Sequence, residues 1–223
     1  GEDFFLQTAV RFAPESLSGF TGICSEQITN GNNNEIDRIL QSGFNPQIKD
    51  DSTYLNPFIL AAKVGNVELV DRFVNLGFDV NSKGHTSTAI FEAITNLNFE
   101  LVDYLLKRGA NINLGSWIEG ETAAMVLITK LHDKNNRTSY DRNTILRMLE
   151  KIIENDYDLD SGAWYGNPLY ESITKNDYEI TELLLKNGAD PYYIQSESNM
   201  NLIEIAYSEN QELGQLLEKY ASF

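Results

Sequence analysis

Pairs of apolar residues recur along the chain, each followed after two further residues by a glycine and a short polar turn. The copies lie at 39–45, 73–79, 105–111 and 184–190, and a weaker copy at 152–158 has Asp156 in place of the glycine. Successive glycine positions are 34, 32, 47 and 32 residues apart. A fixed period of about 33 residues is typical of stacked supersecondary units. The pattern therefore predicts a repeat protein in which one unit carries about 14 extra residues.

Each repeat is predicted to consist of two short helices. In the unit around Gly65, apolar residues in 58–64 and in 67–74 follow helical spacing on either side of a short turn. The glycine after each second helix is expected to form the C-terminal cap, where a positive φ costs glycine least. Asp156 suits the same position, because aspartate adopts the left-handed conformation more readily than most residues.

Several segments resemble the ankyrin repeat. They are Asn-Pro-Phe-Ile-Leu-Ala-Ala at 56–62, Thr-Ala-Ile-Phe at 88–91, Gly-Ala-Asn-Ile-Asn at 109–113, Thr-Ala-Ala-Met at 122–125, Asn-Pro-Leu-Tyr at 167–170 and Gly-Ala-Asp-Pro at 188–191. The resemblance covers about residues 20–221 and implies an all-α ankyrin-repeat solenoid of about six helix-turn-helix units with short β-turn fingers. The histidine position of the family's T-P-L-H motif holds Ile59, Phe91, Met125 and Tyr170, which keeps it a packing position.

The same resemblance divides the chain into an N-terminal extension, 1–19, and an ankyrin-repeat domain, 20–223, with an insertion near 130–143. The extension is expected either to cover the first repeat as a short helix or to be a partly disordered leader. In the last repeat, Glu204, Glu209, Glu212 and Glu218 are expected to give the polar outer face that a terminal repeat requires.

Composition and charge narrow the choice of partner. The 223 residues include 17 Lys and Arg against 33 Asp and Glu, a net charge of −16. We expect neither nucleic acid nor a membrane as partner, because both attract basic surfaces, and a basic protein is favoured instead. Residues 150–223 hold 15 acidic and 4 basic residues, whereas 130–151 holds 3 acidic and 6 basic ones. No apolar run approaches the roughly 20 residues of a membrane-spanning helix.

Few residues are candidates for catalysis. Cys24 is the single cysteine and is expected to be a buried, inert thiol. His85 and His132 are expected to be solvent-exposed, the first in an inter-repeat turn and the second in the insertion. Neither has a second ligand at metal-binding spacing. We therefore predict that the chain is not an enzyme and that it uses no cofactor.

Asp156, Asp158 and Asp160 alternate like the first half of an EF-hand loop. That loop requires glycine at its sixth position and glutamate at its twelfth, which are Ser161 and Asn167 here. The segment is therefore predicted to be an acidic turn, and no metal site is expected.

The resemblance implies that the first helices line a concave surface and that the inter-repeat turns project beside it as fingers. Both tryptophans of the chain fall in such turns, each eight residues after the repeated glycine position. Exposed Trp and Tyr residues often dominate binding energy at interfaces. The predicted partner-binding residues are Tyr54, His85, Trp117, Trp164, Tyr165, Tyr192 and Tyr193. The equally open alternative is that these rings fold back on their own hairpins as local packing.

The first functional hypothesis is a non-catalytic protein–protein interaction module, an adaptor or inhibitor that acts as a monomer on a basic protein. The divergent repeats and 23 asparagines look similar to bacterial ankyrin proteins. An immunity protein that neutralises a toxin and a secreted effector acting on host proteins are both specific roles of that kind. The second hypothesis is a regulatory repeat module of a larger enzyme, and the third is a structural spacer.

The N-terminus leaves the compartment open. The chain begins with Gly1 rather than Met, so a removed signal peptide and an upstream domain are both alternatives. We expect a soluble protein, either cytoplasmic or, after signal-peptide removal, periplasmic or secreted.

Overall fold

A computed structural model describes residues 26–32, 34, 36, 38, 56–84, 87–115, 120–133, 141–163 and 165–222. The chain divides into two compact units, Gly1–Ala110 and Asn111–Phe223. Within the described residues all regular structure is helical, and only isolated β-bridges, such as the one between Lys83 and Thr88, accompany the helices. The prediction of an all-α fold is confirmed.

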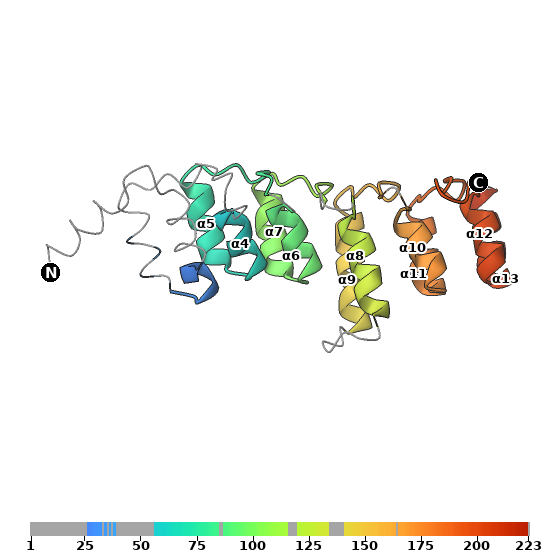
Figure 1. The fold of residues 1–223 in the computed structure, drawn as a ribbon, viewed down its shortest axis with the longest axis horizontal. Helices are drawn as coiled ribbons and strands as arrows, with labels where there is room; N and C mark the ends of the chain where they lie inside the picture. Colours follow the sequence, from blue (N-terminus) through green and yellow to red (C-terminus); the bar gives the residue numbers. More distant parts are fainter. Residues whose placement is uncertain are drawn as a thin grey trace, which may run out of the picture. The chain divides into compact units, whose positions relative to one another are not determined.

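The first unit contains two helix pairs in its described residues (Figure 1). They are α4 (Pro57–Lys63) with α5 (Val67–Asn75), and α6 (Ala89–Thr95) with α7 (Phe99–Lys107). Helix α4 packs against α5 and α6, and α6 packs against α7. The core here is aromatic, since the rings of Phe58, Phe73 and Phe78 have centroids 5.0–6.5 Å apart. Such tilted and edge-on ring pairs add to the stabilisation from burial.

The second unit contains three helix pairs in its described residues. They are α8 (Ala123–His132) with α9 (Arg142–Ile153), α10 (Pro168–Thr174) with α11 (Tyr178–Lys186), and α12 (Leu202–Glu209) with α13 (Gln211–Ala221). Helix α10 packs against α8, α11 and α12, so successive first helices lie side by side. The core here is largely aliphatic, with Leu127, Ile145, Leu169 and Leu184 fully buried.

Polar side chains begin most of the helices. The side chains of Asn66, Asn98 and Asn167 each accept a hydrogen bond from the backbone N–H three residues later. An N-cap of this kind stabilises a helix by about 1 kcal/mol relative to alanine. In α8 the Thr122 side chain makes no cap bond, and the backbone N–H of Ala124 instead donates to the hydroxyl of Tyr157 at 3.1 Å. A residue of the next repeat therefore caps α8.

The predicted C-terminal caps are confirmed at Gly77, Gly109, Gly188 and Asp156, while Gly43 of the first copy lies outside the described residues. Gly77, Gly109 and Gly188 have φ values of 92°, 85° and 94°. Asp156, which takes the glycine position in the weaker copy, has a φ of 59°. The repeated glycine therefore marks the left-handed residue that ends each of these second helices.

The extra residues of the fourth repeat are partly helical. Helices α8 and α9 have 10 and 12 residues, whereas α4, α6 and α10 have 7 each and α5, α7 and α11 have 9 each. Lys130 and His132, which the sequence places in an insertion loop, lie in the last turn of α8, and Arg142 and Asn143 lie in the first turn of α9. Residues 134–140 of the predicted insertion lie outside the described residues.

Other expectations from the sequence can be compared with the described residues. Five helix pairs lie within 56–222, and residues 26–29 are helical where a first repeat is predicted. Ile59, Phe91 and Met125 are buried at the histidine position of the motif, while Tyr170 is half-buried. The four glutamates expected on the outer face of the last repeat are all exposed. The extension 1–19 and Cys24 lie outside the described residues.

Candidate protein-binding surface

The segments that connect a second helix to the next first helix form a bonded row in the second unit. We call 111–122, 154–167 and 187–201 the finger segments; their described parts run along the upper edge of this unit in Figure 1. The Asn113 side chain donates to the Asp156 carbonyl at 3.2 Å and accepts from the Asp158 N–H at 2.7 Å. The Asp190 N–H donates to Asp160 Oδ1 at 2.8 Å. Each finger segment is thus tied to the next.

Three of the predicted partner-binding residues lie in the described finger segments. Tyr165 is half-buried, and its hydroxyl donates to Glu121 Oε1 at 3.0 Å. Tyr192 is 56% exposed, with its hydroxyl 3.3 Å from the carbonyl oxygen of Ala221 at the end of α13. Tyr193 is half-buried, and its carbonyl accepts from the Leu202 N–H, the first residue of α12. Each of the three bonds a different partner within the chain, and their role in binding stays a prediction.

The other four predicted residues, Tyr54, His85, Trp117 and Trp164, lie outside the described residues. Their place in the partner-binding surface also stays a prediction.

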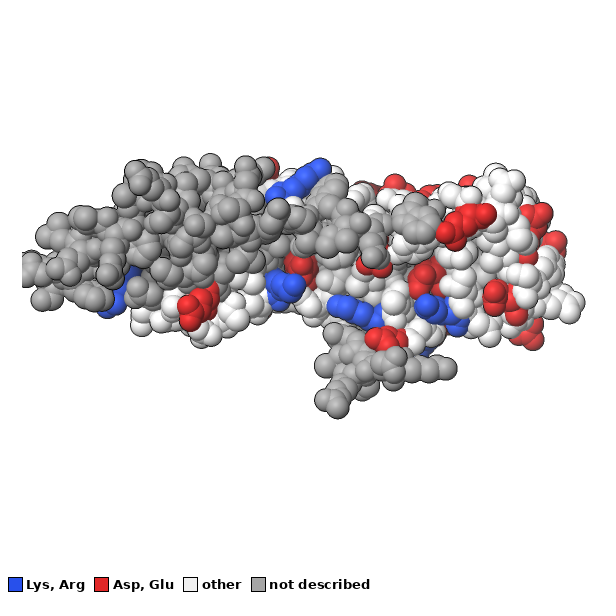
Figure 2. Space-filling view, viewed as in Figure 1, with Lys and Arg blue, Asp and Glu red and all other residues white. Residues whose placement is uncertain are grey.

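Charge is segregated within the second unit. The finger segments hold eight acidic residues and no basic one, and the first helices α8, α10 and α12 hold three acidic and one basic. The second helices α9, α11 and α13 hold five of each sign. Figure 2 shows, for one face, that Asp and Glu side chains predominate over the part of this unit that contains α10 to α13. The net negative charge therefore belongs to the fingers and first helices.

Tyr170 lies on this acidic surface. A Cβ added at Gly166 would lie 2.3 Å from Tyr170 Cδ1. The tyrosine ring therefore packs directly against the backbone of the finger segment at this glycine. Partial burial raises the pKa of Tyr170. The nearby charges of Glu197, Glu171 and Glu209 raise it further. The side chains of Glu197 and Glu209 are exposed to solvent. Their carboxylates can therefore accept bonds from a partner.

The alternating aspartates form a turn that bonds its own backbone. Asp158 Oδ1 accepts from the N–H groups of Asp160 and Ser161, both at 3.1 Å. Partial burial raises the pKa of Asp160, and the neighbouring charges of Asp190 and Asp158 add to this effect. In the portion of the chain that the structure describes, no group of three or more His, Cys, Asp or Glu side chains is placed to hold a metal ion.

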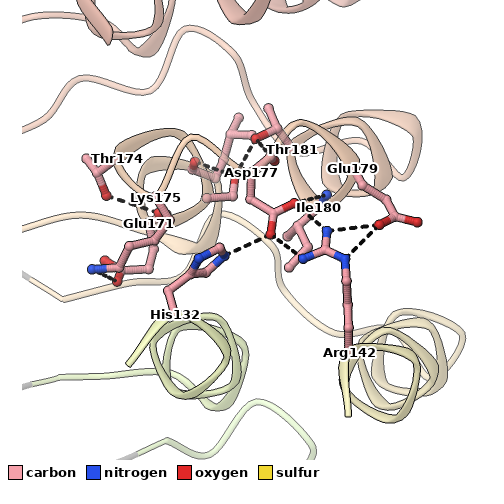
Figure 3. A network of polar contacts seen from close by, with 11 residues as sticks. His132, Arg142, Glu171, Thr174, Lys175, Asp177, Glu179, Ile180 and Thr181 are labelled. Atoms are coloured by element: carbon pink, nitrogen blue, oxygen red, sulfur yellow. Dashed lines mark hydrogen bonds and ion pairs between the residues drawn. The ribbon is translucent and has the colours of Figure 1, made fainter. Parts of the chain in front are cut away.

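His132 is not the solvent-exposed residue expected from the sequence. Its Nε2 lies 2.8 Å from Asp177 Oδ2, and its side chain is 27% exposed (Figure 3). Asp177 lies 45 residues further along the chain, so no local pattern could reveal this contact.

Arg142 completes the same network. Its Nη1 and Nη2 donate to the two carboxylate oxygens of Asp177, and its Nε donates to Glu179 Oε2. Burial favours the neutral form of Asp177, but the bonds from Arg142, the Ile180 N–H and His132 outweigh it, and the pKa of Asp177 is lowered. The bond to Asp177 raises the pKa of Arg142. Through these bonds the arrangement holds the ends of α8, α9 and α11 together.

A second polar contact joins the same two repeats. Thr129 in α8 donates to Glu171 Oε1 in α10 at 2.8 Å, and Lys175 Nζ lies 3.1 Å from the same oxygen. Sequence reasoning missed the Thr129–Glu171 contact, because its partners lie in different repeats.

The helices of the described residues can be compared with the requirements of a membrane crossing. None of those in the described residues combines the length and the apolar composition that a membrane crossing requires.

Residues 23–116 match a family model of ankyrin repeats in three copies. The chain is 28% identical over 145 residues to the phosphocholine transferase AnkX of Legionella pneumophila, and 27% identical over 168 residues to a mitochondrial disaggregase of Bos taurus. These matches cover 63% and 70% of this chain but only 14% and 21% of the relatives, so the chain spans a small part of their length.

Two solved structures have similar folds. The first is the solved structure of a predatory endopeptidase of Bdellovibrio bacteriovorus in complex with an immunity protein. One chain of it matches the present chain with a TM-score of 0.61 and 20% identity, and the match covers 88% of this chain and 96% of that one. The ankyrin repeat domain of Bcl-3 gives a TM-score of 0.68 and 14% identity, covering 87% and 81%. With the glycine caps, the helix pairs and the match of residues 23–116 to the family model, these likenesses identify the fold as an ankyrin-repeat array.

Proposed function

We propose that this protein is a non-catalytic inhibitor or adaptor that binds a basic protein through the finger segments and first helices of residues 111–223. The observation that carries the proposal is the segregation of charge, with eleven acidic residues and one basic residue on these elements and balanced charge on the second helices. Helix packing alone does not require this distribution, because both sets of helices expose polar residues to solvent.

An acidic face of this kind acts first on the rate of association. Complementary potentials steer a basic partner into encounter and raise the association rate at low ionic strength. The short-range contacts then come from groups such as Tyr170, Glu197 and Glu209, which are open to a lysine or arginine side chain. Association should therefore slow as salt rises, since the Debye length falls to about 10 Å at 0.1 M.

Within this class we favour an immunity-type inhibitor that neutralises an enzyme. Support comes from the similar fold found in the complex of a predatory endopeptidase with an immunity protein, where the match covers almost all of the neighbouring chain. At 20% identity the likeness concerns the fold.

A second candidate function is a repeat module of a larger effector enzyme. The observation that favours it is that the match to AnkX covers only 14% of that protein. The natural gene product separates the two candidates. A further folded domain with an activity of its own would favour the module, and a product with no such domain would favour the inhibitor.

The first test identifies the partner and then measures how it binds. The immobilised chain is used to retain proteins from the source organism, and a retained protein is purified and assayed with and without the chain. The proposal predicts a basic protein whose association rate falls between about 50 mM and about 500 mM NaCl. If the retained protein is an enzyme, equimolar chain should inhibit it. An acidic partner, or a rate independent of salt, would contradict the proposal.

Matched variants then locate the surface. Glu197→Gln with Glu209→Gln removes two charges from the acidic surface, and Glu150→Gln with Glu212→Gln removes two exposed charges from second helices. The first pair should lower the association rate about threefold or more, while the control pair should leave it nearly unchanged. Equal effects from both pairs would show that only net charge matters.

The predicted tryptophans need their own test. Changing both Trp117 and Trp164 to Ala should weaken binding at least about tenfold with the fold intact, because large aromatic anchors dominate many interfaces. Circular dichroism checks the fold, and titration with the purified partner measures the affinity. Unchanged affinity would show that these rings serve local packing.

A further inference from the structure

One buried carboxylate contacts three helix ends in the second unit. His132 is the last residue of α8, Arg142 is the first residue of α9, and Asp177 is the N-cap of α11. Asp177 Oδ2 lies 2.8 Å from His132 Nε2 and 2.8 Å from Arg142 Nη1, and Oδ1 lies 2.6 Å from Arg142 Nη2. Figure 3 shows the aspartate between the ends of the two helices. The two ends of segment 133–141 therefore bind the same side chain.

The carboxylate is almost completely removed from water. The Asp177 side chain is 3% exposed, and Oδ1 also accepts from the Ile180 N–H at 3.1 Å. A buried charge is tolerated only when its hydrogen-bonding capacity is filled, and here one backbone donor, one imidazole and a two-pronged guanidinium fill it. Removing the carboxylate would deprive both helix ends of their shared partner at once.

The contact coincides with a change in repeat geometry. In three other described pairs, three residues separate the first helix from the second, at 64–66, 96–98 and 175–177. Between α8 and α9 the separation is nine residues, and each helix is three residues longer than its counterparts in those pairs. Three residues extend a helix by about 4.5 Å. The turns that carry His132 and Arg142 are therefore the added ones, which the shorter helix pairs lack.

We propose that Asp177 anchors the added turns of α8 and α9 to α11 and so fixes both ends of segment 133–141. A residue of one repeat thereby holds the two helix ends that flank the insertion of the preceding repeat. Breaking the anchor should release these helix ends locally, while the remaining contacts between α8 and α10 keep the repeats together.

Amide hydrogen exchange measured by mass spectrometry on the whole chain tests the anchor. In Asp177→Asn, exchange should accelerate about tenfold or more in the last turn of α8 and the first turn of α9, because opening there loses its main restraint. Peptides from α4 to α7 should not change and serve as an internal reference. Unchanged exchange at the two helix ends would overturn the proposal.

Ser172→Ala supplies a matched control in the same repeat. Ser172 is buried and its hydroxyl contacts Leu169 O and Thr181 Oγ1, so its loss also disturbs a buried polar contact between α10 and α11. It touches neither His132 nor Arg142. Equal acceleration in this variant would mean that the effect is general loosening, and would overturn the anchor.

A third variant applies if Asp177→Asn fails to fold. In Arg142→Gln the Asp177 carboxylate keeps its bonds from His132 and the Ile180 N–H, so this variant retains more of the network. The anchor predicts faster exchange in the first turn of α9, with a smaller effect in α8 because His132 keeps its contact with Asp177. No acceleration in α9 would overturn the proposal.

Discussion

Each unit contains an aspartate that accepts bonds from an arginine and from a ring-bearing side chain, but the two sites differ in burial. In the first unit, Asp71 accepts from the Tyr104 hydroxyl at 2.7 Å and from Arg108 Nη2 at 3.0 Å. In the second unit, Asp177 binds His132 and both terminal nitrogens of Arg142. The Asp71 side chain is 39% exposed and the Asp177 side chain 3%.

The comparison shows that an aspartate–arginine ion pair affects stability differently at an exposed site and at a buried one. An exposed ion pair contributes about 0–1 kcal/mol, because water solvates either partner well when the pair is broken. A buried charge has no such alternative, so losing its partner costs several kcal/mol even where the intact pair adds little net stability. Breaking the Asp71 contacts therefore leaves both partners solvated, whereas breaking those of Asp177 leaves a buried carboxylate without its donors.

The largest expected difference comes from removing each carboxylate. Asp177→Asn should lower the free energy of unfolding by about 3 kcal/mol, because the amide carries no charge and offers Arg142 and His132 one acceptor oxygen in place of two. Asp71→Asn should cost less than about 1 kcal/mol. Urea unfolding followed by circular dichroism measures both. Similar losses in the two variants would break the comparison.

The pH dependence of stability gives a second test. Because the folded-state pKa of Asp177 is lowered, its stabilising effect is fully present above the ordinary aspartate value of about 3.9 and is lost as the pH falls through the lowered value. The difference in unfolding free energy between wild type and Asp177→Asn should stay constant between about pH 7 and pH 5 and shrink below about pH 4. A difference that grows in acid would contradict this assignment.

Conservative arginine substitutions should have intermediate effects. Arg142→Lys keeps the charge but cannot bind both oxygens of Asp177 and Glu179 together, and should cost about 1–2 kcal/mol. Arg108→Lys at the exposed site should change stability by less than about 0.5 kcal/mol. Thermal unfolding of the two variants side by side checks the order, and equal effects would show that burial is unimportant here.

The smallest expected effect concerns Tyr104. Partial burial and the hydrogen bond to Asp71 raise the pKa of Tyr104 to about 12. The unfolded chain releases this proton near pH 10 while the folded chain retains it, so stability should fall as the pH rises from about 10 to about 12. Ultraviolet titration of wild type against Tyr104→Phe measures the ionisation. If Tyr104 instead titrates near pH 10, its hydroxyl does not bond Asp71.

Much of the fold could be predicted from the sequence because its determinants are local. The glycine at the end of each second helix needs a positive φ, and its spacing along the chain marks the helix pairs. Even Asp156 could be assigned to this position, since the conformational preference belongs to the residue itself.

The polar contacts between repeats could not be predicted in the same way. His132 and Asp177 are 45 residues apart, and their meeting depends on how far α8 extends before the chain turns. The helix extension itself has no distinct sequence signal, because Lys130 and His132 suit a helix end and a polar loop equally well. Segregation of acidic residues on the finger segments likewise appears only after each residue is assigned to its element.

The double role of the asparagine caps determines which contacts deamidation would remove. Asn98 Oδ1 accepts from the Leu101 N–H at 3.0 Å, and its Nδ2 donates to Gly65 O in the preceding repeat at 3.5 Å. Asn210 likewise accepts from Glu212 N and donates to Asn176. Deamidation to aspartate would keep the oxygen that caps the helix but remove the nitrogen that bridges the repeats. Slow hydrolysis would therefore loosen the contacts between repeats before it unwinds any helix.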